Sequence, residues 1–200
     1  DHKLGYADAY ELGPREIVRI TADGYETLSP AGEEMKICAF LWTYYGYPNS
    51  NYEGVNVEVM RYRNGERMAQ DDKERGVAQD LDYVAGVPDS GLPPAEGYSH
   101  ESGIPFGEGL IKNRYVGRTF IEPTQELRAM GVRMKLNPLR DNIEGKRLVV
   151  IDDSIVRGTT MVQLVKMLRN AGAKEIHIRI NSPEVIWPCF YGIDTDVQSQ

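Results

Sequence analysis

The sequence predicts an α/β fold with a mostly parallel central sheet flanked by helices, and three short strands support this prediction. Residues 148–151 form an uninterrupted aliphatic run, which is typical of a strand buried on both faces. Apolar residues between 161 and 168 then repeat with helical spacing, and Gly172 is placed to end that helix. Further strands are expected at residues 83–88 and 175–180, so strands alternate with helices along the chain.

Composition describes an acidic globular chain. The 200 residues are 41% hydrophobic and carry a net charge of −7, which suits one sizeable core and gives no electrostatic basis for binding nucleic acid. The apolar runs are shorter than the roughly 20 residues that a transmembrane helix needs, so no membrane segment is expected. Two cysteines, Cys38 and Cys189, argue against a disulfide framework and predict a reducing, cytoplasmic location.

The first 30 residues are expected to form a unit separate from residues 31–200. The stretches 17–20 and 25–28, joined by a turn, predict a β-hairpin. A lone hairpin is marginally stable, so we expect it to belong to a sheet whose other strands lie outside this chain.

The next segments lead to a second strand and helix. The aromatic-rich stretch 36–50 predicts a core strand followed by a loop, and the middle of 55–79 predicts an amphipathic helix with a solvated face. The strand at 83–88 is followed by a turn, Asp89-Ser90-Gly91, and then by a helix at 93–102. Small and hydroxylated residues in such a turn offer backbone and hydroxyl donors to a ligand.

Polar residues also follow the strand at 148–151. They are Asp152 and Asp153, and then Ser154, Gly158, Thr159 and Thr160. Backbone N–H groups and hydroxyls at the start of a helix can converge on a phosphate. Two acids followed by a phosphate-sized nest suit one ligand with vicinal hydroxyls and a phosphate, a ribose 5-phosphate. An isolated Asp-Asp pair would more often be only a polar turn, so the interpretation depends on the whole string.

A cluster of cations lies between these motifs. Lys112, Arg114 and Arg118 fall within seven positions, around Tyr115. Ordinary surface charge is the alternative, but in an acidic chain a group of Lys and Arg beside a tyrosine is better explained by a bound anion. With three histidines and no acid at ligand spacing, no zinc site is expected.

The string K-R-L-V-V-I-D-D-S-I-V-R-G-T-T, residues 146–160, resembles the phosphoribosyl-pyrophosphate (PRPP) motif of type I phosphoribosyltransferases. With S-I-V-R inside it, it looks most like the glutamine PRPP amidotransferase family. V-P-D-S-G at 87–91 resembles that family's diphosphate loop, and residues 112–125 resemble its mobile catalytic loop. The resemblance implies a type I phosphoribosyltransferase fold and conversion of PRPP and glutamine, or ammonia, into 5-phosphoribosylamine, pyrophosphate and glutamate, the first committed step of purine synthesis.

The resemblance also implies roles for individual residues. PRPP would bind to two groups of residues: Asp89, Ser90 and Gly91 in the first, and Asp152, Asp153, Ser154, Ile155, Val156, Arg157, Gly158, Thr159 and Thr160 in the second. The implied catalytic residues are Lys112, Arg114, Tyr115 and Arg118. The implied Mg²⁺ ligands are Ser90, Asp152 and Asp153, which suits an ion that prefers a few protein oxygens plus substrate phosphates. Feedback inhibition by purine nucleotides and a homo-oligomer, a dimer or tetramer, are further implications.

Residues 12–20 are similar to the closing strands of the family's glutaminase domain, which implies that residues 1–30 are a remnant of it and 31–200 a C-terminally truncated transferase domain. The family's glutamine-cleaving nucleophile is an N-terminal cysteine, whereas residue 1 here is Asp, so at most ammonia-dependent activity is expected. Cys38 and Cys189 match two of the four cysteines that hold a [4Fe–4S] cluster in many members.

The chain departs from the family pattern at Leu41, Tyr47 and Asn49, where an acid, an arginine and an aspartate are usual. Two alternatives stay open. One is a nucleobase phosphoribosyltransferase, which shares the PRPP motif but not the W-P-C-F-Y-G-I-D ending at 187–194. The other is a PRPP-binding regulator without turnover, which would normally carry a basic DNA-binding unit that this sequence does not show.

Overall fold

The computed structural model describes residue 5, residues 10–115, 135–155 and 158–184, and residues 186, 187 and 189. The chain divides into two compact units, Asp1–Cys38 and Ala39–Gln200, and each is described by itself. Within the described residues, no helix has both the length and the apolar character needed to cross a membrane.

The first unit contains the predicted hairpin. Strands β1 (Ile17–Thr21) and β2 (Gly24–Ser29) pair antiparallel, with Thr21 opposite Gly24. Gly24 has φ +139°, a backbone conformation that glycine adopts without steric cost. Apolar side chains of the hairpin are largely in solvent, and Ile20 is 79% exposed. The hairpin prediction is confirmed, and the strands bury little surface within their own unit.

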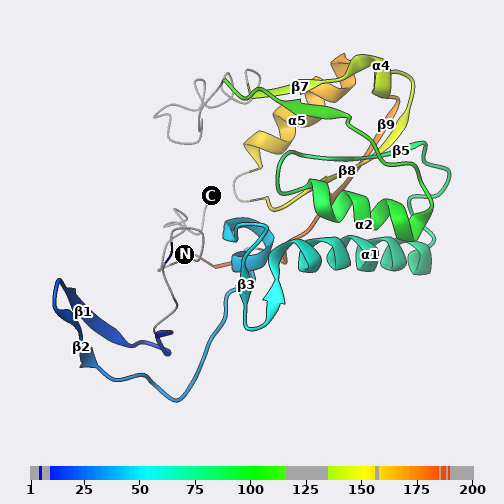
Figure 1. Cartoon of the computed structure of the whole chain (residues 1–200). Coiled ribbons are helices and arrows are strands. Elements are labelled where there is room, and N and C mark those ends of the chain that lie inside the picture. The colour runs from blue at the N-terminus through cyan, green and yellow to red at the C-terminus, as the bar shows by residue number, and fades with distance from the viewer. Residues whose placement is uncertain are drawn as a thin grey trace. The chain divides into compact units, whose positions relative to one another are not determined.

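The second unit is built on a parallel sheet with the strand order β5-β8-β9. The central strand β8 (Arg147–Asp152) lies between β5 (Tyr83–Gly86) and β9 (Glu175–Ile180), as Figure 1 shows. Both neighbours run parallel to β8, and Asp152 is paired with Ile180 at the carboxyl end. The predicted parallel sheet of three strands is thereby confirmed.

Helices cover both faces of this sheet. They are α1 (Val57–Arg75), α2 (Leu92–Ser102), α4 (Arg140–Ile143) and α5 (Thr159–Asn170). Leu148 and Val150 of β8 belong to a core that includes residues of α5, whereas Val149 and Ile151 belong to a second core with residues of α1 and α2. Successive side chains of a strand point to opposite faces, so β8 is the middle of three layers.

Two glycines let α1 and α2 touch through their backbones. A Cβ on Gly65 would lie 1.9 Å from the carbonyl oxygen of Pro94, and a Cβ on Gly97 would lie 2.0 Å from that of Tyr62. Real atoms cannot approach so closely, so only glycine fits at either position. The helices at 55–79 and 93–102 are confirmed, and the glycines explain how closely they pack.

The aromatic-rich stretch 36–50 does not form the predicted core strand. Leu41–Tyr45 form a short π-helix, η2, which ends where Gly46 N donates to Leu41 O at 2.7 Å. The cause is Arg61 of α1, which is 3% exposed. Its guanidinium donates to the carbonyl oxygens of Trp42, Tyr44 and Gly46 at 2.7, 3.3 and 3.1 Å, and a strand could not present these oxygens to one side chain.

Two small antiparallel pairs were not predicted. β6 (Leu110–Lys112) pairs with β7 (Leu136–Pro138), and β3 (Asn51–Tyr52) pairs with β4 (Val55–Asn56) just before α1. The β6–β7 pair is tied to the following segment, because Leu139 N donates to Gly109 O at 3.0 Å. This pairing fixes the position of Lys112 at the end of β6.

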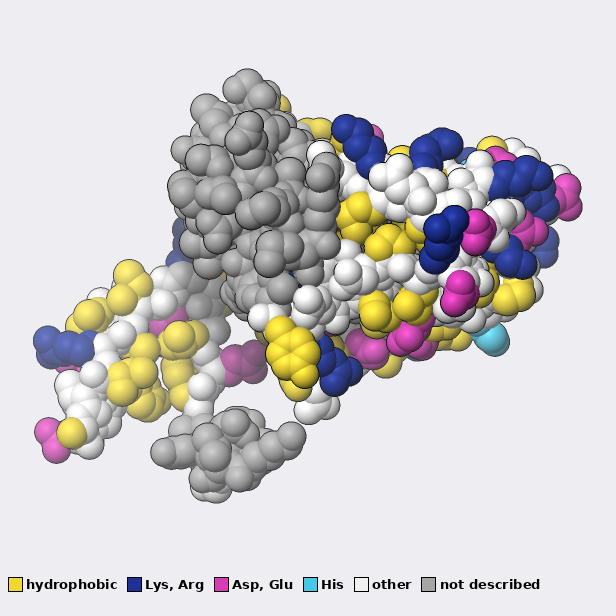
Figure 2. Space-filling model, turned by 90° about the horizontal axis from the view of Figure 1, so that it is seen from above, with side chains coloured by type: hydrophobic (Ala, Val, Ile, Leu, Met, Phe, Trp, Pro, Cys, Tyr) yellow, Lys and Arg dark blue, Asp and Glu magenta, His cyan; other side chains and the backbone are white. Residues whose placement is uncertain are grey.

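Charges of both signs share the surface drawn in Figure 2, where Lys and Arg side chains alternate with Asp and Glu side chains and with hydrophobic ones. Some charges form ion pairs one helical turn apart, such as Arg67 with Asp71 of α1 at 2.8 Å. Exposed pairs of this kind contribute only about 0.3–0.5 kcal/mol each. This face is therefore a mixed surface, unlike the single-signed field that attracts nucleic acid.

A buried polar network links α1, α2 and β9. Tyr98 is 1% exposed, and its hydroxyl donates to Asp72 Oδ2 at 2.6 Å, while Arg179 Nε donates to the same oxygen at 2.7 Å. Burial, together with the hydrogen bond to Asp72, raises the pKa of the Tyr98 hydroxyl above its ordinary value. Arg179 of β9 thus forms a structural ion pair with Asp72 of α1.

We expect Tyr98→Phe to lower the free energy of unfolding by about 1–2 kcal/mol, because it removes one buried hydrogen bond. Asp72→Ala should cost more, about 3 kcal/mol, since Arg179 would be left without its partner. Urea denaturation of the whole chain measures both. Tyr47→Phe is the matched control, because Tyr47 is 73% exposed, and it should change stability by less than about 0.5 kcal/mol. Equal losses in all three variants would contradict the network's role.

Candidate active site

The carboxyl ends of three parallel strands meet at one edge of the sheet (Figure 1), and predicted site residues follow two of them, β5 and β8. Ligands of open α/β sheets bind at such an edge. Backbone hydrogen bonds tie the edge together, because Val87 N donates to Ile151 O at 2.8 Å and Asn181 N donates to Asp152 O at 2.9 Å. The loops after β5, β8 and β9 therefore start from fixed positions.

Asp153 joins two of these loops. It is 9% exposed, and its carboxylate accepts hydrogen bonds from Ser90 of the loop after β5 and from Ser154, the latter at 2.5 Å. Asp152 lies beside it, and its Oδ1 accepts the backbone N–H of Asp153 at 2.9 Å. The structure thus brings together four of the predicted residues, Ser90, Asp152, Asp153 and Ser154.

The two acids differ in their electrostatic environment. Burial raises the pKa of Asp152 from 3.8 to about 7, the charge on Asp153 adds to this, and the N–H of Asp153 opposes it. A carboxylate that is costly to ionise in the folded chain gains from a nearby cation. The edge of the sheet therefore favours a ligand or ion that brings positive charge or hydrogen-bond donors to Asp152.

The loop after β5 runs against β8 without a side chain between them. A Cβ on Gly91 would lie 2.4 Å from Ile151 O, and a Cβ on Gly86 would lie 2.5 Å from Gly91 O. Glycine is therefore required at both positions. With Gly91 packed inward and Ser90 bonded to Asp153, Asp89 is the residue of this turn whose side chain reaches solvent, with 71% of that side chain exposed.

The loop after β8 leads into α5. Gly158 has φ +69° and precedes the first residue of the helix, and Val162 N donates to its carbonyl at 3.0 Å. Ile155 and Thr160 are exposed, and for Thr159 only the backbone is described. Val156 and Arg157 lie outside the described residues. In the described residues, the predicted phosphate site thus consists of backbone groups at the start of α5, at the carboxyl edge of the sheet.

Strand β6 places Lys112, the first of the predicted cations, beside the loop after β5. Lys112 forms an ion pair with Asp89, and both residues line a hollow of about 770 Å³ together with Pro88, Leu92, Glu108, Leu110, Ile111, Asn113, Arg114, Tyr115 and Asn137. Arg114 and Tyr115 are exposed, Tyr115 to 99%. Arg118 lies outside the described residues. The structure places Lys112 beside the loop after β5, and Arg114 and Tyr115 line the same hollow.

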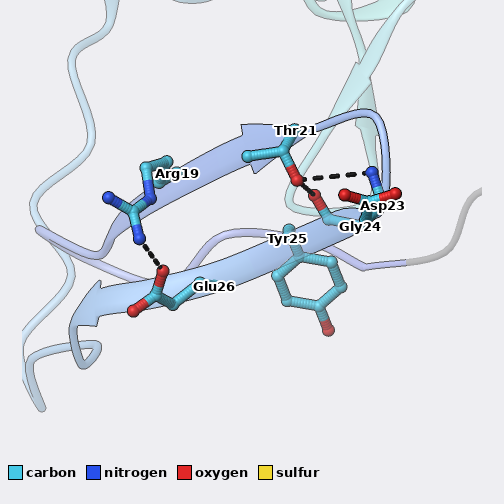
Figure 3. A pocket seen from close by; sticks show the side chains of 6 residues that line it. All are labelled: Arg19, Thr21, Asp23, Gly24, Tyr25 and Glu26. Carbon is cyan, nitrogen blue, oxygen red and sulfur yellow. Dashed lines mark hydrogen bonds and ion pairs between the residues drawn. The ribbon is translucent and has the colours of Figure 1, made fainter.

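A second hollow, of about 420 Å³, lies on the hairpin of the first unit (Figure 3). Two of its polar side chains already have partners within the hairpin, because Arg19 pairs with Glu26 and the Thr21 hydroxyl donates to the backbone carbonyl of Gly24 at 3.3 Å. Its two acids, Asp23 and Glu26, lie on a hairpin of two antiparallel strands, and Glu26 is already paired with Arg19. It is therefore a depression of the hairpin surface with no candidate chemistry.

Two residues of α1, Arg61 and Asn64, support the carboxyl edge of the sheet, and the sequence analysis did not single them out. Burial lowers the pKa of the Arg61 guanidinium, and the negative charges of Glu58 and Asp153 oppose this shift. One turn further along, Asn64 Nδ2 donates to Asn181 O at 3.4 Å. In the described part of the chain the side-chain amide of Asn181 and the hydroxyl of Ser182 are buried without a hydrogen-bond partner. An arginine in a charged helix carries no sequence signal for such a role.

Fold and site together define a phosphoribosyltransferase domain. A family model described as the phosphoribosyl transferase domain matches residues 60–180, and the chain belongs to this family. The chain is 54% identical over 191 residues to an amidophosphoribosyltransferase of Synechococcus elongatus, covering 95% of this chain and 38% of that protein. It is 47% identical to the Bacillus subtilis amidophosphoribosyltransferase, covering 95% and 39%.

Two solved structures agree with these relatives. One, described as the allosteric regulatory enzyme of purine biosynthesis, matches 94% of this chain and 39% of its own with a TM-score of 0.74 and 48% identity. The other is glutamine PRPP amidotransferase from B. subtilis complexed with ADP and GMP, with a TM-score of 0.74, 47% identity and coverage of 93% and 40%. The type I phosphoribosyltransferase fold is therefore confirmed, and the chain spans about two-fifths of each relative's length.

The raised pKa of Asp152 has a consequence for stability. The folded state holds this proton up to about pH 7, whereas the unfolded state releases it near 3.8. Between these values the folded state binds more protons, so the stability that this group contributes falls as the pH rises. Asp152→Asn should therefore gain stability relative to the parent chain by about 2 kcal/mol between about pH 5 and about pH 8.

Urea denaturation in the presence of a chelator measures this difference, since the chelator removes cations that would offset it. Asp141→Asn is the control, because Asp141 is an exposed acid of α4. The stability gain of Asp152→Asn on raising the pH should exceed that of this control. A constant offset for Asp152→Asn across this range would show that ionisation of Asp152 is not penalised by folding.

Proposed function

We propose that this chain is the transferase part of an amidophosphoribosyltransferase, which makes 5-phosphoribosylamine from PRPP in the first committed step of purine synthesis. The observation that carries the proposal is the acid pair at the end of β8, joined through Ser90 to the loop after β5. The kinship with amidophosphoribosyltransferases at about half identity supports the same assignment. Fold alone would not, because one fold hosts many activities.

The reaction sets two electrostatic demands. A nitrogen–carbon bond forms at C1 of the ribose, the C1–oxygen bond breaks, the electron pair leaves with pyrophosphate, and one proton passes from nitrogen to solvent. Negative charge grows on the leaving group and positive charge on the ring as the bond stretches. Catalysis therefore needs cations at the diphosphate and negative or dipolar groups near the ring.

The acid pair serves the ribose side of this reaction. Asp153, fixed by Ser90 and Ser154, and Asp152 beside it can accept hydrogen bonds from the two ring hydroxyls and temper positive charge on the ring. The backbone at Gly158 and the start of α5 binds the 5-phosphate, which places C1 relative to the acids. Binding energy from this remote phosphate positions the reacting carbon.

The diphosphate is stabilised by the segment that begins at the end of β6. Its residues are Lys112, Arg114 and Tyr115, together with Arg118, which lies outside the described residues. Lys112 already lies against the loop after β5, and Arg114 follows it along the same hollow. Two or three cations around a departing diphosphate stabilise the charge that develops there. Ammonia needs no deprotonation if it arrives neutral, so the proposal assigns no general base.

Magnesium fits the donor set that the site offers. Ser90, Asp152 and Asp153 supply hydroxyl and carboxylate oxygens within one edge of the sheet, and Mg²⁺ takes a few such ligands plus substrate phosphates. When bound with PRPP, the ion neutralises part of the diphosphate charge. Its positive charge would also offset the cost of ionising Asp152.

An iron–sulfur cluster does not fit the described residues, which contain no group of three or more His, Cys, Asp or Glu side chains able to hold a metal. Cys38 is exposed and belongs to the first unit, whereas Cys189 belongs to the second. A [4Fe–4S] cluster takes four thiolates. No step of the proposed reaction passes through such a cluster, which stays a proposal for a longer protein that includes this chain.

Other implications of the family resemblance stay predictions. They are the hairpin as part of a glutaminase domain that supplies ammonia from glutamine, inhibition by purine nucleotides, a dimer or tetramer, and a cytoplasmic location. The nucleotide proposal has one observation in its favour, since the B. subtilis relative is described in complex with ADP and GMP.

The purified chain with Mg²⁺, PRPP and ammonium chloride at alkaline pH should release pyrophosphate in a coupled assay. Asp152→Asn and Asp153→Asn should each lower kcat/KM by about 100-fold or more, since each removes charge at the ring. The exposed Asp141→Asn should stay within about twofold of the parent chain.

Other results would redirect the assignment. Pyrophosphate release that depends on a purine base rather than on ammonium would make the chain a nucleobase transferase. Calorimetric binding of PRPP without turnover would favour the regulator. Absence of both binding and turnover would refute the proposal.

A further inference from the structure

The ion pair between Lys112 and Asp89 lies at the candidate diphosphate site itself. Lys112 ends β6 and Asp89 begins the turn after β5, so the pair connects two segments that are 23 positions apart in sequence. Asp89 is mostly exposed, with 71% of its side chain in solvent, whereas the Lys112 side chain is 35% exposed. Both line the hollow of about 770 Å³.

The charge of Asp89 conflicts with a role in holding diphosphate. An ionised carboxylate has only acceptor oxygens, and so do the phosphate groups that the turn would receive. The other members of the turn are already engaged, because Ser90 donates to Asp153 and Gly91 packs against Ile151. The one side chain that the turn presents to the hollow is thus an anion, and it is neutralised by the cation that the diphosphate needs.

We propose that Asp89 is an internal competitor for Lys112: its carboxylate holds the Lys112 ammonium in the unliganded chain, and an incoming diphosphate displaces it. This inference rests on the proposed function and replaces the expectation that Asp89 itself binds PRPP. Arg114 lines the same hollow, and its guanidinium suits bidentate contact with phosphate. Lys112 therefore switches between an internal and an external anion at one place.

The size of the effect follows from competition. A ligand that binds only the fraction of molecules with a free Lys112 has its affinity lowered by that fraction. Exposed ion pairs are weak, so the competitor should weaken diphosphate binding by only about two- to sixfold. Removal of the competitor should nevertheless tighten diphosphate binding, whereas removal of a binding residue weakens it.

Titration calorimetry with inorganic pyrophosphate and Mg²⁺ separates the two roles. Asp89→Asn should lower the Kd of pyrophosphate by about two- to sixfold relative to the parent chain. Glu96→Gln is the matched control, because it removes one exposed negative charge from α2 without touching the pair. It reports how much any loss of negative charge tightens anion binding, and it should shift the Kd by less than about 1.5-fold.

A second pair of variants tests whether the effect passes through Lys112. Lys112→Gln should weaken pyrophosphate binding, and adding Asp89→Asn to it should produce no tightening beyond that of Glu96→Gln. Thermal unfolding of each variant checks that it is folded. Weaker binding in Asp89→Asn, or tightening that persists without Lys112, would overturn the competitor role. If the parent chain binds neither pyrophosphate nor PRPP, the proposed function falls as well, so the two failures are distinguishable.

Discussion

Burial of β8 on both faces is the constraint on which the rest of the second unit depends. Leu148, Val149, Val150 and Ile151 are all 0% exposed, and they alternate between the two cores. A strand enclosed in this way cannot slip by one residue without placing every side chain in the wrong core. The acids that follow it therefore inherit a fixed register, and their positions relative to Ser90 and α5 follow from packing rather than from local loop structure.

Much of this arrangement could be predicted because its signals are local. The aliphatic run at 148–151 and the helical repeat at 161–168 each determine an element without reference to distant residues. Parallel pairing then follows, because such strands joined through helices have their carboxyl ends at one edge. That edge brings Ser90 to Asp153, two residues that the family resemblance had assigned to one site.

The features that were not predicted depend on contacts between residues far apart in the sequence, which no local pattern indicates. The stretch 36–50 has the aromatic content of a strand, yet Arg61 draws its carbonyls into a helical turn from 15 to 19 positions away. β6 and β7 are each only three residues long, too short for a periodic signal, and they pair across a long intervening segment. The ion pair between Lys112 and Asp89 joins residues 23 positions apart, and no local sequence pattern indicates it.

The glycine contacts between α1 and α2 have a consequence for how the domain can move. With Gly65 against Pro94 and Gly97 against Tyr62, the two backbones interlock, and neither helix can slide or rotate past the other. The turn that carries Asp89 and Ser90 leads directly into α2, so one wall of the site is a rigid body. A substrate that enters this site therefore meets a wall whose position is set by the packing of the helix pair.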